Sequence, residues 1–146
     1  MNLTYPLLLI FSLSIFLFGS CKTAQVSPEK YEKAKVYFGN GGGFTGELRE
    51  FCLLENGDVF QINPSSRQAT LRNSGAKSLT KSIFKDMAEM DLKKYSYDQP
   101  GNLYYWMKYQ TDSDSTYLIW GHSDMVVEEE IVNLYETLVE LTKKNK

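Results

Sequence analysis

Residues 47–62 read ELREFCLLENGDVFQI and give the clearest local signal in the chain. Two apolar runs flank Asn56-Gly57, the dipeptide that most strongly favours a two-residue β-hairpin turn. Strand side chains alternate between the two faces of a sheet. With a two-residue loop, the face expected to form the core carries Phe51, Leu53, Phe60 and Ile62. The opposite face carries Cys52, Leu54 and Val59.

The segments around this hairpin predict a mixed domain. Residues 103–110 (LYYWMKYQ) and 115–120 (STYLIW) are rich in strand-forming residues, and TDSD between them predicts a second hairpin. Apolar residues recur at helical spacing in 79–90 and 127–143. Short strands are expected at 34–38 and 70–71. The fold predicted is α+β: an antiparallel sheet of two β-hairpins plus an N-terminal strand, with two helices packed on one face in a ββαββα-like order.

The amino-terminal residues predict export. Residues 1–20 contain no Lys, Arg, Asp or Glu, and 7–18 form an apolar run. That run is shorter than the roughly 20 residues of a membrane-spanning helix and suits the core of a signal peptide. Phe18-Gly19-Ser20-Cys21 then resembles a bacterial lipobox, whose Cys receives a diacylglycerol and becomes the new amino terminus. Two features depart from that pattern: no Lys or Arg precedes the run, and Phe stands where Leu is usual.

The resemblance divides the chain into three parts. It implies a lipoprotein signal peptide at 1–20, a lipidated Cys21 with a polar tether over 21–35, and a single α+β domain at 36–146. Each buried methylene of an acyl chain contributes about 0.8 kcal/mol, so two or three chains anchor a protein permanently. Lys22 replaces the Asp that would favour the inner membrane, so the outer membrane is expected, on its periplasmic or its surface face. Plain secretion and an uncleaved anchor remain alternatives.

Composition excludes several function classes. The net charge is −2, and basic residues are scattered among acidic ones, which argues against nucleic-acid binding. A single histidine and the lack of a CxxC pair predict no metal site and no cofactor. Cys52 lies in an apolar strand, so a buried, inert thiol is favoured over a reactive one.

Glycine is concentrated in residues 37–46 (YFGNGGGFTG), which hold five of the ten glycines. A phosphate-binding P-loop needs a Lys after the last glycine and then a helix, and neither is present or expected here. The segment is predicted to be a loop, either a structural linker or a binding loop whose amides meet an anion or a partner. The residues of that candidate loop are Gly39, Asn40, Gly41, Gly42, Gly43 and Phe44.

The second hairpin contains a candidate aromatic surface. Aromatic side chains on an exposed sheet face stack on sugar rings or on a protein partner, although filling the core is the alternative role. The candidates are Tyr104, Trp106, Tyr117 and Trp120.

Several stretches resemble a group of small, uncharacterised Bacteroidota-type lipoproteins: FGNGGGFTG at 38–46, LLENGDVF at 53–60, DLKKYSYDQPGNLYYWMKY at 91–109 and IWG at 119–121. The resemblance implies a lipid-anchored exported domain and assigns no catalytic residue. We therefore expect a non-catalytic binding module of the cell envelope, with an envelope protein or a glycan as ligand. Two alternatives stay open. One is an envelope hydrolase using His122, Ser123, Asp124 or Cys52, and the other is an inhibitor or immunity-type partner of another envelope protein.

Overall fold

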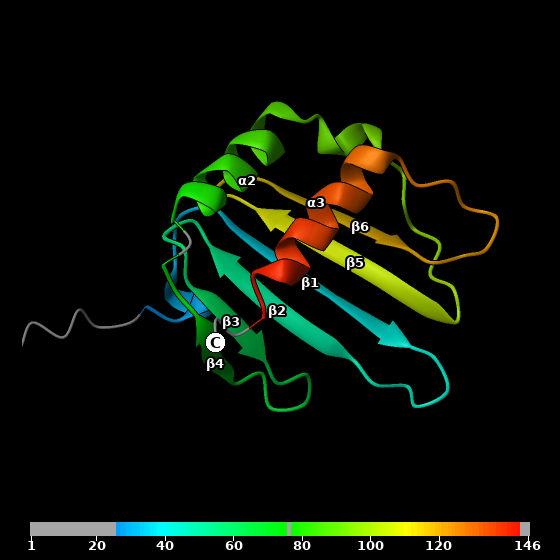
Figure 1. Cartoon of the computed structure of the whole chain (residues 1–146), viewed down its shortest axis with the longest axis horizontal. Coiled ribbons are helices and arrows are strands. Elements are labelled where there is room, and N and C mark those ends of the chain that lie inside the picture. Colours follow the sequence, from blue (N-terminus) through cyan, green and yellow to red (C-terminus); the bar gives the residue numbers. More distant parts are fainter. Residues whose placement is uncertain (1–25, 76, 144–146) are drawn as a thin grey trace, which may run out of the picture.

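The computed structural model describes residues 26–75 and 77–143. Six strands form one antiparallel sheet in the order β4-β3-β2-β1-β5-β6. The strands are β1 (Lys35–Gly42), β2 (Arg49–Leu54), β3 (Val59–Ile62), β4 (Ala69–Asn73), β5 (Leu103–Gln110) and β6 (Ser115–Trp120). The helical elements are η2 (Pro28–Lys30), α2 (Lys77–Glu89), η3 (Leu92–Lys94) and α3 (Glu129–Glu140). Both α-helices lie on one face of the sheet, which confirms the predicted α+β class (Figure 1).

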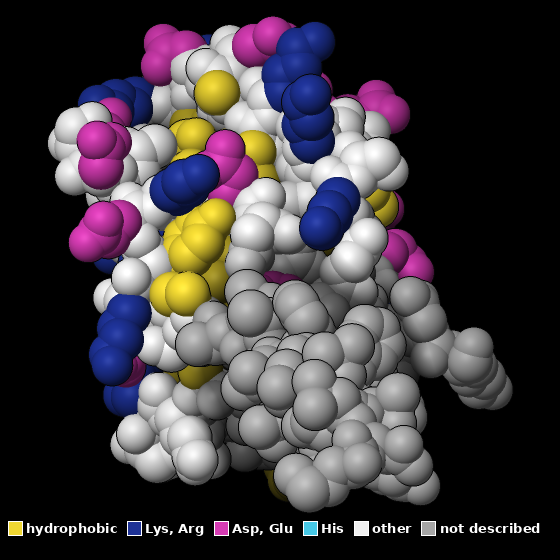
Figure 2. All heavy atoms as spheres, turned by 90° about the vertical axis from the view of Figure 1, so that its left-hand side faces the viewer, with side chains coloured by type: hydrophobic (Ala, Val, Ile, Leu, Met, Phe, Trp, Pro, Cys, Tyr) yellow, Lys and Arg dark blue, Asp and Glu magenta, His cyan; other side chains and the backbone are white. Residues whose placement is uncertain are grey.

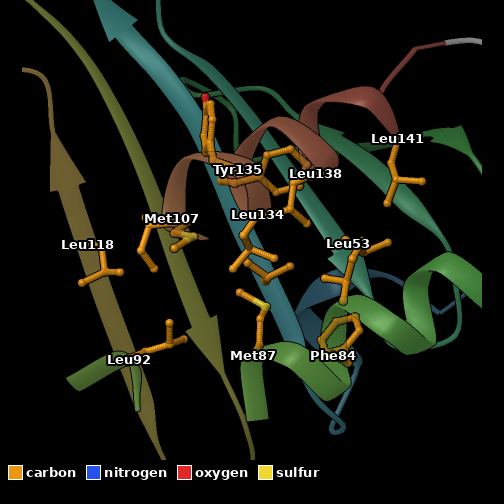
Figure 3. Close-up of a cluster of buried hydrophobic side chains, with 14 of the residues drawn as sticks. Leu53, Phe84, Met87, Leu92, Met107, Leu118, Leu134, Tyr135, Leu138 and Leu141 are labelled. Carbon is orange, nitrogen blue, oxygen red and sulfur yellow. The ribbon is translucent and has the colours of Figure 1, made fainter. Parts of the chain in front are cut away.

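The main core lies between the helices and the sheet. Apolar residues at helical spacing give α2 and α3 one buried stripe each, and these stripes meet alternate side chains of β1, β2, β5 and β6. Figure 3 shows the leucines of α3 pointing toward the strands and toward Met87 and Phe84 of α2. The members with almost no exposure include Val36, Phe38, Leu53, Met107, Leu118, Ile131 and Leu138.

The first hairpin is present, but its predicted register is wrong by one residue. Leu53, not Leu54, pairs with Val59, and the amide of Leu54 donates to the carbonyl of Asp58 at 2.9 Å. The loop therefore has three residues, and it ends on Gly57 with a φ of 96°, as in a type I turn followed by a bulge. A one-residue shift exchanges the faces of a strand. Val59 accordingly joins Leu53 in the main core, whereas Phe60 turns to the opposite face.

A second, smaller core covers part of that opposite face, which we call the open face. Its buried members are Cys52, Leu54, Phe60 and Ile62, with Tyr31 and Tyr37 packed against them. The chain from residue 26 to residue 34 closes this cluster, because Pro28 is buried and Lys35 Nζ donates to the carbonyls of Pro28 and Tyr31, both at 2.8 Å. The predicted tether over 21–35 is thus folded onto the sheet from residue 26 onward. Cys21 and the predicted signal peptide at 1–20 lie outside the described residues.

The glycine-rich segment is mostly strand, so the predicted loop is wrong in its position. β1 continues from Lys35 to Gly42 and pairs with β5 along its whole length, ending with Gly42 opposite Leu103. Only residues 43–48 turn the chain into β2. The aromatic strand β5 provides the reason, because its unbroken ladder of hydrogen bonds holds the glycines in extended pairing.

Thr80 in α2 gives a stability prediction. Its side chain has no exposure, and its hydroxyl has no hydrogen-bond partner within the described part of the chain. An unsatisfied buried polar group costs about 1–3 kcal/mol, so Thr80→Val should raise the free energy of unfolding by about 1 kcal/mol in urea denaturation. Thr137→Val is the matched control, since the Thr137 hydroxyl donates to the carbonyl of Asn133 at 2.7 Å. A loss of stability in Thr80→Val would show that the hydroxyl is satisfied in solution.

Candidate functional site

The uncovered half of the open face lies over β6, β5 and the second half of β1. The helices cover the other face of these strands, and the segment 26–34 reaches only the half around β2 and β3. Side chains of β5 and β6 alternate between the faces. Those of Tyr104, Trp106, Tyr117 and Ile119 therefore share the uncovered half.

Two glycines of β1 form the floor of this region. Gly39 pairs with Trp106, and Gly41 pairs with Tyr104. A Cβ atom at Gly41 would lie 2.5 Å from the Tyr104 hydroxyl oxygen, and one at Gly39 would lie 3.2 Å from Cε2 of Trp106. The aromatic rings of β5 thus occupy the space that side chains of β1 would fill. Glycine is common in a strand at positions where another group must come close to the backbone.

The result is an apolar groove, which we call the aromatic groove. It is lined by Leu48, Pro100, Tyr104, Trp106, Tyr117 and Ile119. The Trp106 and Tyr117 rings stand side by side with centroids 6.0 Å apart and planes inclined at 36°. Trp106 is 9 % exposed and Tyr117 is 51 % exposed, so the indole forms the base of the groove and the tyrosine forms its wall.

Charged groups lie next to the groove on the same face. Glu50 pairs across the sheet with Gly39 of β1 in the row that also contains Trp106. The Arg67 guanidinium donates to both carboxylate oxygens of Glu50, at 2.5 and 2.8 Å, and this pairing raises the pKa of Arg67. Burial, and then the nearby Tyr104 and Glu50, raise the pKa of Tyr117. Tyr117 can therefore keep its phenolic proton and act as a hydrogen-bond donor.

Trp120 does not belong to the groove, which corrects the predicted aromatic surface. Its side chain faces the helices and is 6 % exposed. Its ring packs edge-on against Tyr135 at 5.3 Å and against Tyr97 at 6.3 Å. The physical reason is the alternation of side chains along a strand, because Trp120 is three positions after Tyr117 in β6 and an odd offset places the two side chains on opposite faces.

The remaining residues of the predicted binding loop separate into different positions. Asn40 is half-buried in β1, and Gly42 packs against the Asn102 carbonyl. Gly43 and Phe44 lie in the turn after β1, where the Phe44 side chain is fully exposed. The turn also supplies Leu48 to the groove. Leu48, Pro100 and Ile119 were missed by sequence reasoning, although the alternation of β6 already places Ile119 beside Tyr117.

The residues proposed for an enzyme do not form a catalytic arrangement. The exposed Ser123 hydroxyl donates to Asp124 at 3.1 Å, and the backbone amide of Asp124 donates to His122 Nδ1 at 3.3 Å. Cys52 is buried in the smaller core, and burial raises the pKa of its thiol to about 12. Among the described residues, no group of three or more His, Cys, Asp and Glu side chains is arranged to hold a metal ion.

Comparison with known proteins adds no assignment. No protein-family model matches the chain, and no curated protein is detectably similar to it.

In residues 26–75 and 77–143, no helix has the length and apolar character needed to cross a membrane.

Proposed function

We propose that the protein is a lipid-anchored, non-catalytic binding module of the cell envelope, and that the aromatic groove binds a saccharide. The observation that carries the proposal is the pair of glycines, Gly39 and Gly41, that lets Trp106 and Tyr104 lie across β1. Glycine inside a strand lowers the stability of the fold. A strand with glycines under aromatic rings is therefore less stable, but it gives the surface a shape that larger residues would not allow. The lipid anchor rests on the lipobox resemblance at Cys21.

The chemistry of the groove suits a sugar. Aromatic rings offer flat apolar faces, and tyrosine adds a hydroxyl at the rim. A pyranose ring has the same amphipathic character, with C–H groups on its faces and hydroxyls on its edge. Glu50 of β2 pairs with Gly39 of the groove floor, and Arg67 of the β3–β4 connection donates to Glu50, so this ion pair could exchange hydrogen bonds with those hydroxyls. The binding energy would then come from stacking on Trp106 and Tyr117, and the polar pair would select the orientation.

Two tryptophans in different environments make the proposal testable by fluorescence. The mature protein is titrated with soluble peptidoglycan fragments and with outer-membrane oligosaccharides. Because Trp106 lies in the groove and Trp120 in the core, the ligand-induced change should persist in Trp120→Phe and disappear in Trp106→Phe. An aromatic contact contributes about 0.5–1.5 kcal/mol, so Tyr117→Ala should weaken the affinity about three- to tenfold, as judged by calorimetry.

Tyr117→Ala also protects the test against misfolding, because this side chain is half exposed and contributes little to the core. Tyr105→Phe is the control, since Tyr105 lies on the neighbouring strand β5 and packs toward the helices. The saccharide assignment fails if no sugar binds. It also fails if a sugar binds to Tyr117→Ala and to Trp106→Phe with the same affinity as to the wild type.

A protein partner is the second candidate, favoured by a different observation. Phe44 in the β1–β2 turn and Val126 in the β6–α3 connection are both highly exposed. Both segments leave the same end of the sheet, because Gly42 pairs with Leu103 and Trp120 pairs with Tyr105. A stoichiometric protein that co-purifies in mild detergent with the native chain, and that is lost in Phe44→Ser, would favour this reading over a sugar.

A further inference from the structure

The outer surface of α2 carries three lysines in a row. Lys77, Lys81 and Lys85 are spaced four residues apart, so they lie on one side of the helix, and all three are exposed. We call this row the lysine ridge. It borders a shallow hollow that is also lined by Lys33, Tyr31 and Phe84.

The hollow has an excess of positive charge. Four lysines line it, and the one carboxylate in its lining is that of Glu55. Lys85 also contacts Glu89 at 3.7 Å, but both side chains are about two-thirds exposed, at 68 % and 65 %. Such surface pairs contribute little and leave the cation available. Figure 2, which shows this side of the molecule, reveals a strip of hydrophobic side chains flanked by lysines or arginines and by acidic groups.

The lysine ridge lies at the end of the domain where the described chain begins. The blue start of the described chain and the start of α2 lie at the same end of the sheet in Figure 1, whereas the β1–β2 turn lies at the opposite end. Contacts agree with the picture, because a Cβ at Gly57 in the β2–β3 turn would lie 3.6 Å from Cγ of Lys77. Counted along β1 from Lys35, the aromatic groove begins in the row of Tyr37, which contains Tyr117, and extends to the row of Gly41, about 7 to 20 Å away at 3.3 Å per residue.

We infer that the lysine ridge docks on anionic lipid head groups and orients the domain on its membrane. The inference rests on the proposed anchor at Cys21. Only four residues lie between Cys21 and Val26. An extended chain covers at most about 3.5 Å per Cα–Cα step, so the five steps span about 18 Å at most. The domain is therefore held close to the membrane surface. There, the attraction of anionic lipid for each lysine contributes about 1 kcal/mol to the binding free energy. In this orientation the aromatic groove faces away from the membrane.

The test compares lysine reactivity on two kinds of vesicle. The acylated full-length mature protein is reconstituted into vesicles of phosphatidylcholine alone or with 30 mol% phosphatidylglycerol. Lysines are then acetylated with a membrane-impermeant reagent and quantified by peptide mass spectrometry. On the anionic vesicles, the lysine ridge should react at least threefold more slowly than on neutral ones. Lys94, which pairs with Glu130 in the first turn of α3, is the internal control and should react equally on both.

Two further arms separate the outcomes. Screening is strong at 1 M salt, where the Debye length is about 3 Å, so the protection should disappear in 1 M KCl. Replacing Lys77, Lys81 and Lys85 together by Gln should make Lys33 react equally on neutral and anionic vesicles. The control change Lys94→Gln should leave the slower reaction of Lys33 on anionic vesicles intact. Equal reactivity of the lysine ridge on both vesicles overturns the inference.

Failure of the anchor would look different. Intact mass reports acylation at Cys21, and flotation on neutral vesicles reports anchoring without electrostatics. A protein that is acylated and floats, yet shows no protection of the lysine ridge, keeps the anchor and loses the orientation. A protein without acyl chains, which does not float on neutral vesicles, contradicts the anchor itself.

Discussion

Gly39→Ala should lower the free energy of unfolding by about 4 kcal/mol or more, a loss that single substitutions rarely reach. An added Cβ at Gly39 would lie 2.0 Å from the carbonyl oxygen of Arg49 on the neighbouring strand β2. That atom belongs to the backbone, so the clash is relieved only if β1 and β2 separate in the middle of the sheet. Chemical denaturation at pH 7 measures the effect, and the thermal midpoint should fall by more than about 10 °C.

Two other glycines of the same segment provide graded controls. Gly43 has a φ of 72° and an open surrounding, so Gly43→Ala should cost only the left-handed backbone penalty of about 1–2 kcal/mol. In Gly41→Ala the new Cβ meets the end of the Tyr104 side chain, which can rotate away. That variant should fold and lose the shape of the aromatic groove. Equal stability losses in all three variants would contradict the assignment of Gly39 as a close-packing position.

The glycines also show where sequence reasoning reaches its limit. Residues 37–46 lack the Lys of a P-loop, and the structure places strand β2 after them. The composition of the same residues, however, predicts a loop, because glycine is common in loops and weakens the interior of a strand. The deciding information lies about sixty residues away, in the partner strand β5, whose aromatic side chains need glycines beneath them. A pairing between distant segments cannot be read from local propensity.

The first hairpin shows the same limit at shorter range. Asn56-Gly57 correctly locates the turn, but the same dipeptide fits a two-residue loop and a three-residue loop ending on glycine. Both registers bury an apolar face, since β2 and β3 are apolar on both sides. The choice follows from the second core under residues 26–34, which gives Phe60 and Ile62 a place on the open face. The second hairpin has no such ambiguity, and its predicted strands, 103–110 and 115–120, match the structure.

The sequence predicts the candidate site only in part, because it shows which side chains share a face and not which face is exposed. Alternation along β5 separates Tyr104 and Trp106 from Tyr105 and Tyr109, and the structure confirms that separation. Which set is exposed depends on where the helices pack, and that is a tertiary property. The assignment of Trp120 was wrong because it considered aromatic character and not the alternation of side chains along β6. That alternation places Tyr117 and Ile119 on one face and Trp120 on the other.

The thiol of Cys52 should be protected and should make stability depend on alkaline pH. Burial raises its pKa from the ordinary 9.0 to about 12, and the nearby Lys35 ammonium opposes the shift. The thiolate population at pH 8 is then about a thousandfold below that of a free thiol, so alkylation by iodoacetamide should be slower by about that factor. If Cys21 is acylated, Cys52 is the one thiol in the chain, and intact mass follows the reaction directly.

The sign of the pH effect follows from linkage. The folded pKa lies above the unfolded one, so the stabilising contribution of the neutral thiol is complete below about pH 9 and is lost as the pH rises toward 12. At about 1.4 kcal/mol per pKa unit, the loss between pH 8 and 10.5 should be about 2 kcal/mol. Tyr37 and Tyr135, whose pKa values are also raised by burial, add to the decline.

Cys52→Ala isolates the contribution of the thiol, because the tyrosines are unchanged in it. Its free energy of unfolding in urea should fall by about 2 kcal/mol less than that of the wild type between pH 8 and 10.5. Parallel pH profiles, or alkylation within tenfold of the free-thiol rate, would show that the segment 26–34 opens readily and exposes β2. A thiol held in this state is not available as a nucleophile, so confirmation of both results would remove Cys52 from any enzymatic reading of the protein.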